Sequence, residues 1–224
     1  MSLVVAVKHK NRIVLGADKQ SSTGGNKNHT STKIWEVPGL PGAIMGSVGS
    51  LRASQVIQYS NIIDKNCIDK EIDTDFVICS LGQVIAATLK EAGVKFELED
   101  EGNCPLMPNS FIFAYRDRAW MIWCDLSVSE IDDYLAIGSG SDVAKGVLFA
   151  TPTKNPFERI VTCIEAAAEN TLFVDDGIDL LMTETRAADK KQIIKALQLE
   201  DEIKKLEEEL KEKSEEITDD NPAE

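Results

Sequence analysis

The start of the chain carries the residue types that nucleophilic catalysis needs. Ser2 follows Met1, and a second residue as small as serine permits removal of Met1. Ser2 would then present a hydroxyl and a free α-amine on one residue. An α-amine has an ordinary pKa of about 7.7–8.0, so near neutral pH it can accept a proton from the neighbouring hydroxyl. The sequence therefore predicts a serine nucleophile at Ser2 whose base is its own amine.

Composition and charge limit the class of protein. The 224 residues carry a formal net charge of −14, which argues against nucleic acid or an anionic membrane as the main partner. No apolar run approaches the length of a membrane span, and the chain does not open like a signal peptide. The 5 cysteines form no C-x-x-C pair, and His9 and His29 have no Cys or His at ligand spacing. We expect a cytoplasmic protein that uses neither a cofactor nor a metal.

Hydrophobic patterning predicts strands and helices in alternating groups. Residues 19–32 hold almost no apolar side chain and predict a loop, with a short strand as the alternative. Apolar runs predict strands over 3–9, 12–18, 33–37, 43–46, 109–115, 119–125, 135–137 and 178–182. Helical spacing predicts helices over 50–65, 74–94, 141–150 and 157–170. The order along the chain is strands, two helices, strands, two helices and a final strand. This order indicates an α+β fold with two sheets and helix layers outside them.

The C-terminal part differs in composition, so we divide the chain into three regions. Residues 1–184 form the predicted α+β domain. Over 185–217, acidic and basic residues surround an apolar stripe at Leu199, Ile203, Leu206 and Leu210. That spacing predicts an amphipathic acidic helix about two heptads long, which suits a short coiled coil. The end, 218–224, is expected to be disordered.

Several stretches together resemble the proteasome β-subunit family, which includes a bacterial proteasome-like peptidase. The resemblance spans residues 2–184 and implies the Ntn-hydrolase fold (Ntn, N-terminal nucleophile). That fold is a four-layer αββα sandwich of two antiparallel sheets, here followed by a C-terminal helical tail. The matching stretches are Ser2-Leu3-Val4-Val5-Ala6-Val7, Val14-Leu15-Gly16-Ala17-Asp18-Lys19, Ser31-Thr32-Lys33-Ile34, Met45-Gly46-Ser47-Val48-Gly49-Ser50 and Ala136-Ile137-Gly138-Ser139-Gly140-Ser141.

The resemblance implies a catalytic role for five residues. Ser2 Oγ would attack the amide carbonyl, with the Ser2 amine as base. Lys33 would lower the pKa of both groups through its positive charge, and Asp18 would keep Lys33 charged and oriented. The Gly46 N–H would donate to the oxyanion, and Ser139 would hydrogen-bond the amine. We therefore predict a peptidase site of Ser2, Asp18, Lys33, Gly46 and Ser139.

The sequence departs from the family in two places. The family nucleophile is usually threonine, and serine lacks the methyl group that restricts χ1. The family's Asp-x-x-Ser-Gly pattern is expected near residues 172–177, where this chain has Leu-Phe-Val-Asp-Asp-Gly. The substrate pocket is expected in the 20–32 loop and the 45–53 segment.

The resemblance also implies polypeptide substrates, a homo-oligomeric ring with its sites inside a chamber, and an ATPase unfoldase at the pore. Two other functions stay open. One is a catalytically inactive assembly or scaffold protein of the same fold that retains Met1. The other is a small-molecule amidase that uses the same nucleophile.

Overall fold

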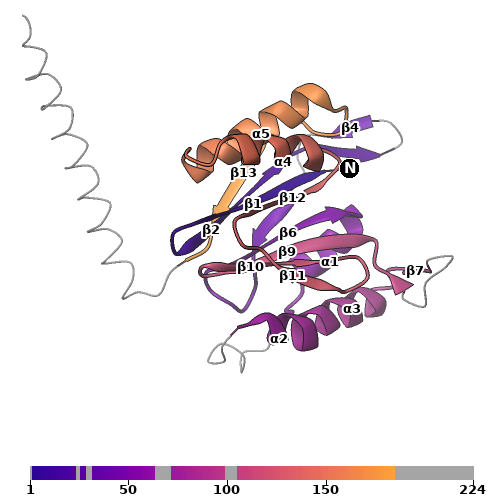
Figure 1. The fold of residues 1–224 in the computed structure, drawn as a ribbon. Coiled ribbons are helices and arrows are strands. Elements are labelled where there is room, and N and C mark those ends of the chain that lie inside the picture. Colours follow the sequence, from indigo (N-terminus) through magenta and orange to yellow (C-terminus); the bar gives the residue numbers. More distant parts are fainter. Residues whose placement is uncertain (1, 24–25, 29–31, 64–71, 99–104, 185–224) are drawn as a thin grey trace, which may run out of the picture. The chain divides into compact units, whose positions relative to one another are not determined.

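Two antiparallel sheets face each other at the centre of the structure, a computed structural model that describes residues 2–23, 26–28, 32–63, 72–98 and 105–184 (Figure 1). Within these ranges the first sheet has the strand order β12-β1-β2-β13, formed by Tyr134–Gly138, Leu3–His9, Arg12–Asp18 and Ile178–Met182. The second has the order β11-β10-β9-β6-β5, formed by Val128–Glu130, Arg118–Ile122, Asn109–Tyr115, Ala43–Gly49 and Ile34–Glu36. Two short hairpins pair β3 with β4 and β7 with β8, at Ser21–Thr23, Asn26–Asn28, Glu97–Leu98 and Pro105–Leu106.

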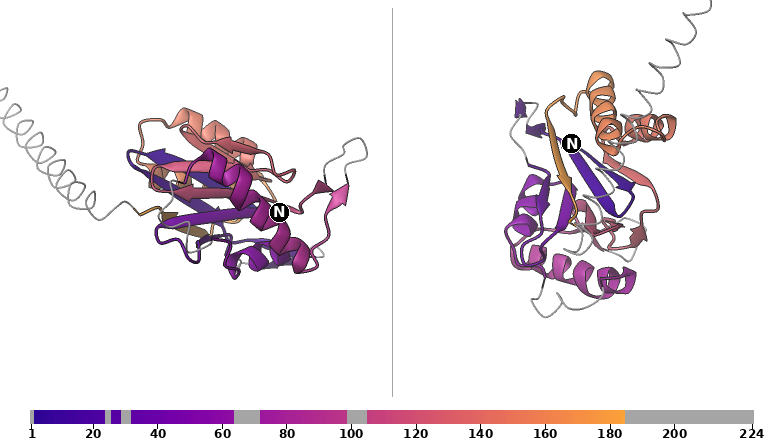
Figure 2. Two further views of the ribbon diagram at one scale, coloured as in Figure 1. Left: turned by 90° about the horizontal axis from the view of Figure 1, so that it is seen from below. Right: turned by 90° about the vertical axis from the view of Figure 1, so that its left-hand side faces the viewer.

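Helices cover the outer face of each sheet, which Figure 2 shows from two further directions. The first sheet is covered by α4 (Ser141–Ala150) and α5 (Pro156–Asn170). The second is covered by α1 (Leu51–Gln58) and by a continuous run of α2 (Thr74–Phe76), the π-helical turn η2 (Val77–Leu81) and α3 (Gly82–Glu91). The expected four-layer αββα sandwich is confirmed. The helix expected over 185–217 and the end at 218–224 lie outside the described residues.

Strand β1 shows why the opening run of the sequence is continuously apolar. Leu3 and Val5 pack against the α4–α5 layer, whereas Val4 and Ala6 face the second sheet. Successive side chains of a strand point to opposite faces, so a strand buried on both faces loses the apolar–polar alternation. Strand β1 therefore lies in the interior of the sandwich, and this burial fixes the position of Leu3 and the residues after it.

The structure corrects two expected boundaries around α1. The strand expected over 43–46 continues to Gly49, and Ser50 caps the helix by accepting a hydrogen bond from the Ala53 N–H. The helix expected over 50–65 ends at Gln58, because the chain turns there and the Ser60 N–H donates to the Ile57 carbonyl. Ile62 and Ile63 are buried as their apolar character indicates, but they lie outside the helix.

No helix in the described ranges is long and apolar enough to cross a membrane.

The contact between β2 and α5 depends on a glycine. A Cβ atom on Gly16 would lie 2.1 Å from Cγ2 of Ile160, a buried residue of α5. By contrast, a Cβ atom on Gly146 in α4 would have no heavy atom within 4 Å. Substitution of Gly146 can therefore serve as the control for substitution of Gly16, because only Gly16 lies at a close contact.

We expect Gly16→Ala to lower the free energy of unfolding by about 1–3 kcal/mol, because α5 would have to move away from the sheet. Gly146→Ala should raise it by about 0.5–1 kcal/mol, since alanine is the better helix former. Urea denaturation of both variants beside the original chain measures the difference. Equal effects would contradict the close packing of α5 on β2.

Candidate active site

The predicted acid and the start of β1 are brought together by the β1–β2 hairpin. The two strands run antiparallel, with Val4 opposite Ala17, so the end of β2 lies beside the beginning of β1. Asp18 is the last residue of β2 and is fully buried there. Its Oδ1 atom accepts a hydrogen bond from the Leu3 N–H at 2.7 Å. Asp18 therefore fixes the backbone directly after Ser2.

Lys33 reaches the same point from the other sheet. It precedes β5, and its Nζ atom lies 2.6 Å from Asp18 Oδ1. Both residues are buried, Lys33 to 5% exposure and Asp18 to 0%. The ion pair thus joins β2 of one sheet to β5 of the other, and the structure brings together two of the five predicted site residues in the predicted pairing.

Burial and pairing act in opposite directions on these two charges. Burial raises the pKa of the Asp18 carboxyl above its ordinary value, against the lowering by Lys33 and by the N–H groups of Leu3 and Gln20. Burial likewise lowers the pKa of the Lys33 ammonium. The negative charge of Asp18 is the largest effect that raises it. Pairing thus offsets only part of the cost of burying the two charges. The role of Asp18 in keeping Lys33 charged stays a prediction.

Ser2 directly precedes β1, is 7% exposed and has its backbone held by contacts on both sides. Its carbonyl oxygen accepts a hydrogen bond from the Ser139 N–H at 2.8 Å. A Cβ atom on Gly138, whose φ is +103°, would lie 1.9 Å from that oxygen, so only glycine permits this approach. The Gly138–Ser139 turn thus positions Ser2 through backbone contacts. The expected contact of Ser139 with the Ser2 amine stays a prediction.

Gly46 lies between the sheets, where a Cβ atom would meet Val4 Cγ1 at 2.8 Å. The direction of its N–H follows from strand alternation. The Ser47 N–H points to β5, where it donates to the Lys33 carbonyl at 2.9 Å, so the Gly46 N–H points the other way, to β9. Gly49, two residues after Ser47, lines a cavity together with Ser2. The oxyanion role of Gly46 stays a prediction.

Two carboxylates near Lys33 are absent from the predicted site. Asp175 is 9% exposed and accepts a hydrogen bond from the Lys19 N–H at 3.0 Å. Asp179 lies 2.8 Å from Lys19 Nζ, and both carboxylates raise the pKa of Lys33. Asp175 belongs to the segment that departs from the Asp-x-x-Ser-Gly pattern. The sequence could have indicated Asp175 as a site residue, because the family pattern also has an acid in this segment, although at a different position.

Among the described residues, no group of three or more His, Cys, Asp and Glu side chains is arranged to hold a metal ion.

The facing sheets, their outer helices and the placement of Ser2, Asp18 and Lys33 define the fold as that of the proteasome-like Ntn hydrolases. Among solved structures, the chain is similar to Thiobacillus denitrificans BPH, a bacterial proteasome homologue, with 22% identity, a TM-score of 0.64 and coverage of 83% of this chain and 99% of that one. The same protein in complex with epoxomicin gives 22% identity, a TM-score of 0.63 and coverage of 81% and 98%.

A third similar structure is eukaryotic HslV from Trypanosoma brucei, with 16% identity, a TM-score of 0.54 and coverage of 82% of this chain and 99% of that one. No protein-family model and no curated protein sequence matches the chain. At these identities the likeness establishes the fold, and the expected resemblance is confirmed at that level.

We expect Asp18→Asn and Lys33→Met each to lower the free energy of unfolding by about 3–5 kcal/mol, because either change leaves the other charge buried and unpaired. The double variant removes both charges, and its asparagine oxygen can still accept the Leu3 N–H. Its stability should equal or exceed that of the original chain, by up to about 4 kcal/mol.

Urea denaturation near neutral pH at a fixed chain concentration provides the measurement. Lys154 is exposed, so Lys154→Met is a control that should change the stability by no more than about 0.5 kcal/mol. A double variant whose loss equals the sum of the two single losses would contradict the paired-charge interpretation.

Proposed function

We propose that this chain is a subunit of a proteasome-like peptidase that cleaves peptide bonds with the Ser2 hydroxyl. The observation that carries the proposal is the buried Asp18–Lys33 pair beside Ser2, in the fold of the proteasome-like hydrolases. A buried ion pair is costly for stability, so its presence next to a potential nucleophile favours a chemical role.

In the proposed reaction, the Ser2 Oγ atom attacks the substrate carbonyl carbon while its proton passes to the Ser2 amine. The positive charge of Lys33 favours this step by stabilising negative charge on the oxygen. Asp18 retains that positive charge on Lys33. The carbon–nitrogen bond then breaks, the amine proton passes to the leaving nitrogen, and an ester of Ser2 remains. Water hydrolyses this ester with the amine again as base.

We assign stabilisation of the oxyanion to a backbone N–H of β6, either that of Gly46 or that of Gly49, which lines a cavity together with Ser2. One such donor contributes about 3–4 kcal/mol to transition-state stabilisation. The Ser139 N–H has a positioning role, since it holds the Ser2 carbonyl at 2.8 Å.

The mechanism requires Ser2 to be the first residue of the mature chain, because an amide nitrogen cannot serve as the base. We also propose a homo-oligomeric ring with an ATPase unfoldase as partner, in a cytoplasmic setting. The resemblance of the sequence supports this assembly. Two exposed aromatic residues at the α4–α5 end, Phe149 at 78% and Phe157 at 38% exposure, are consistent with subunit contacts.

Ser2→Ala should reduce cleavage of a short fluorogenic peptide at least about 10³-fold, since the attacking oxygen is lost. Lys33→Met should be nearly as damaging, because the two residues act as one unit. Ser2→Thr is the matched control. It keeps the hydroxyl and amine, and it should retain activity within about tenfold, because its added methyl group restricts only χ1.

Mass spectrometry of the same preparations shows whether Met1 has been removed. Denatured casein serves as a polypeptide substrate, and the native mass shows whether the chains form a ring. Equal activity of Ser2→Ala and the original chain would overturn the proposal. A chain that retains Met1 and is inactive favours the scaffold alternative. Cleavage confined to small amides by a monomer favours the amidase alternative.

The pH dependence of kcat/KM should be bell-shaped, because it reports the essential groups of the free enzyme. Activity rises as the Ser2 amine loses its proton and becomes a base. It falls again when Lys33 deprotonates, and burial lowers the Lys33 pKa below 10.5, so the alkaline limb should lie below that pH. An alkaline limb at or above 10.5, once unfolding is excluded by circular dichroism, would argue that Lys33 does not have this role.

A further inference from the structure

A network of buried polar side chains lies where β6 ends and α1 begins. Its members, Ser47, Ser54 and Asn109, are all buried, and the proposed reaction uses none of them. The Asn109 Nδ2 atom donates to Ser47 Oγ at 2.7 Å and to Ser54 Oγ at 3.0 Å, and the two serine oxygens lie 3.1 Å apart. Polar groups are costly to bury, so three of them gathered at one point call for a specific reason.

Asn109 also bonds both backbone groups of Ser50, the residue that caps α1. Its Oδ1 accepts from the Ser50 N–H at 2.9 Å, and its Nδ2 lies 3.2 Å from the Ser50 carbonyl oxygen as a donor. The amide side chain therefore acts as a neighbouring strand would. It continues the hydrogen bonding of β6 with β9 one residue beyond their last pair, Gly49 with Asn109. This contact fixes the peptide between Gly49 and Ser50.

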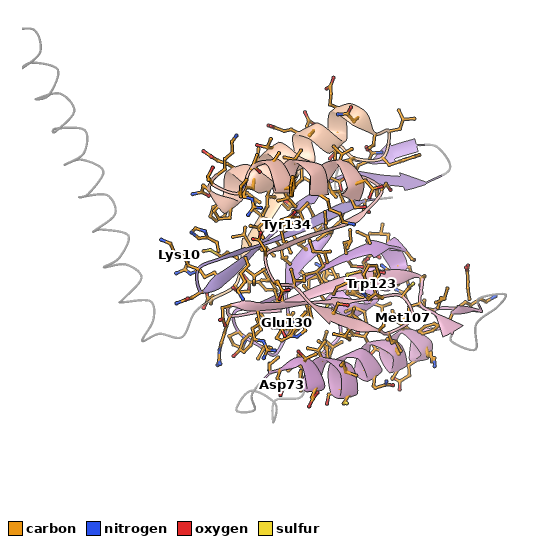
Figure 3. The ribbon with its side chains drawn as sticks, viewed as in Figure 1. Lys10, Asp73, Met107, Trp123, Glu130 and Tyr134 are labelled. Atoms are coloured by element: carbon orange, nitrogen blue, oxygen red, sulfur yellow. The ribbon has the colours of Figure 1, made fainter. Side chains whose placement is uncertain are left out.

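The fixed peptide follows a glycine whose conformation other residues avoid. The φ of Gly49 is +123°, and a Cβ atom there would lie 2.2 Å from the Pro108 carbonyl oxygen. Gly49 lines a cavity of about 330 Å³ together with Ser2. Met107, which Figure 3 labels, lines the same cavity from the segment before β9. The polar network thus holds a stretch of backbone that shares a cavity with the proposed nucleophile.

Gly46, the other candidate for the oxyanion donor, has different surroundings. It packs between the sheets against Val4, and its N–H points to β9. A developing oxyanion needs a donor that lies near the nucleophile and is held in place before the reaction. The cavity shared with Ser2 supports Gly49 on the first condition, and the contacts of Asn109 support it on the second.

We propose that Asn109 is a positioning residue, which holds the Gly49 backbone so that its N–H can donate to the oxyanion formed at Ser2. The inference rests on the proposed function and deepens it, because it assigns the donor and names the buried side chain that acts through it. Without the amide, the N–H and carbonyl of Ser50 lose a partner and the turn after β6 loosens. Substrate binding then changes little, whereas stabilisation of the oxyanion falls.

The test compares a peptide aldehyde with the matching alcohol. Ser2 Oγ adds to the aldehyde carbon of acetyl-Leu-Leu-leucinal, the carbon–oxygen double bond becomes a single bond, and the Oγ proton passes to the Ser2 amine. The former aldehyde oxygen then carries the negative charge that an oxyanion donor stabilises. Acetyl-Leu-Leu-leucinol has no carbonyl group at that position and reports binding alone. Calorimetry on the full-length chain gives both affinities for the original chain and for each variant.

In the original chain we expect the aldehyde to bind at least about 100-fold more tightly than the alcohol. Asn109→Ala should reduce this advantage at least about tenfold, because the donor is displaced, and it should change the affinity of the alcohol less than about twofold. For the fluorogenic peptide, kcat should fall at least about tenfold while KM stays within about twofold. Asn109→Asp keeps an acceptor for the Ser50 N–H, so its losses should be smaller.

Thr183→Val is the matched control. Thr183 is a buried polar residue whose Oγ1 accepts the Ile13 N–H at 2.9 Å, near the end of β2 that is remote from Asp18. Like Asn109→Ala, this variant should lower the melting temperature measured by circular dichroism. It should leave the aldehyde advantage unchanged.

An undiminished aldehyde advantage in a folded Asn109→Ala or Asn109→Asp chain would overturn the inference. An equal loss of advantage in Thr183→Val would do the same, as would an equal loss of affinity for the aldehyde and the alcohol in Asn109→Ala. Failure of the proposed function has a different signature. An original chain that binds both compounds equally would overturn that function, and this inference with it.

Discussion

The ion pair of Asp18 and Lys33 is the constraint around which the two sheets meet. A lysine that projects from one sheet into the dry space beside the other must find a carboxylate there, or it loses its charge. Asp18 meets that need with Oδ1, and its Oδ2 accepts the Gln20 N–H at 3.1 Å. The position of β5 relative to β2, and with it the depth of the sandwich near Ser2, depends on this contact.

Small residues complete the arrangement because the backbone itself builds the site. Gly46 allows Val4 of the first sheet to approach the second, and Gly138 allows a turn to lie on the Ser2 carbonyl. The site combines the buried pair of Lys33 and Asp18 with a cavity beside Ser2 whose described lining residues are uncharged.

The sequence was sufficient for the layers of the fold and for the pairing of Asp18 with Lys33. The layers follow from the apolar runs, and the pairing was implied by the resemblance of the motifs to the proteasome β-subunit family. The sequence was insufficient where tertiary contacts determine the end of an element or the approach of a distant residue. Continuation of β6 to Gly49 depends on pairing with β9. Cys124 approaches Ser2 only through folding, from a position more than 100 residues later, and no local pattern indicates it. For Asp175 the only signal was an acid in the segment that departs from the family pattern.

The two hydrogen bonds that flank Ser2 restrict how its atoms can move. The Leu3 N–H is held by Asp18 and the Ser2 carbonyl by Ser139, so the peptide plane between Ser2 and Leu3 is fixed at both ends. Rotation about the Cα–Cβ bond then remains the main freedom of the hydroxyl. Neither contact uses the nitrogen of Ser2. The fold can therefore assemble this environment before that nitrogen is exposed, and release of the preceding residue would change the chemistry of one atom without any rearrangement of the chain around it.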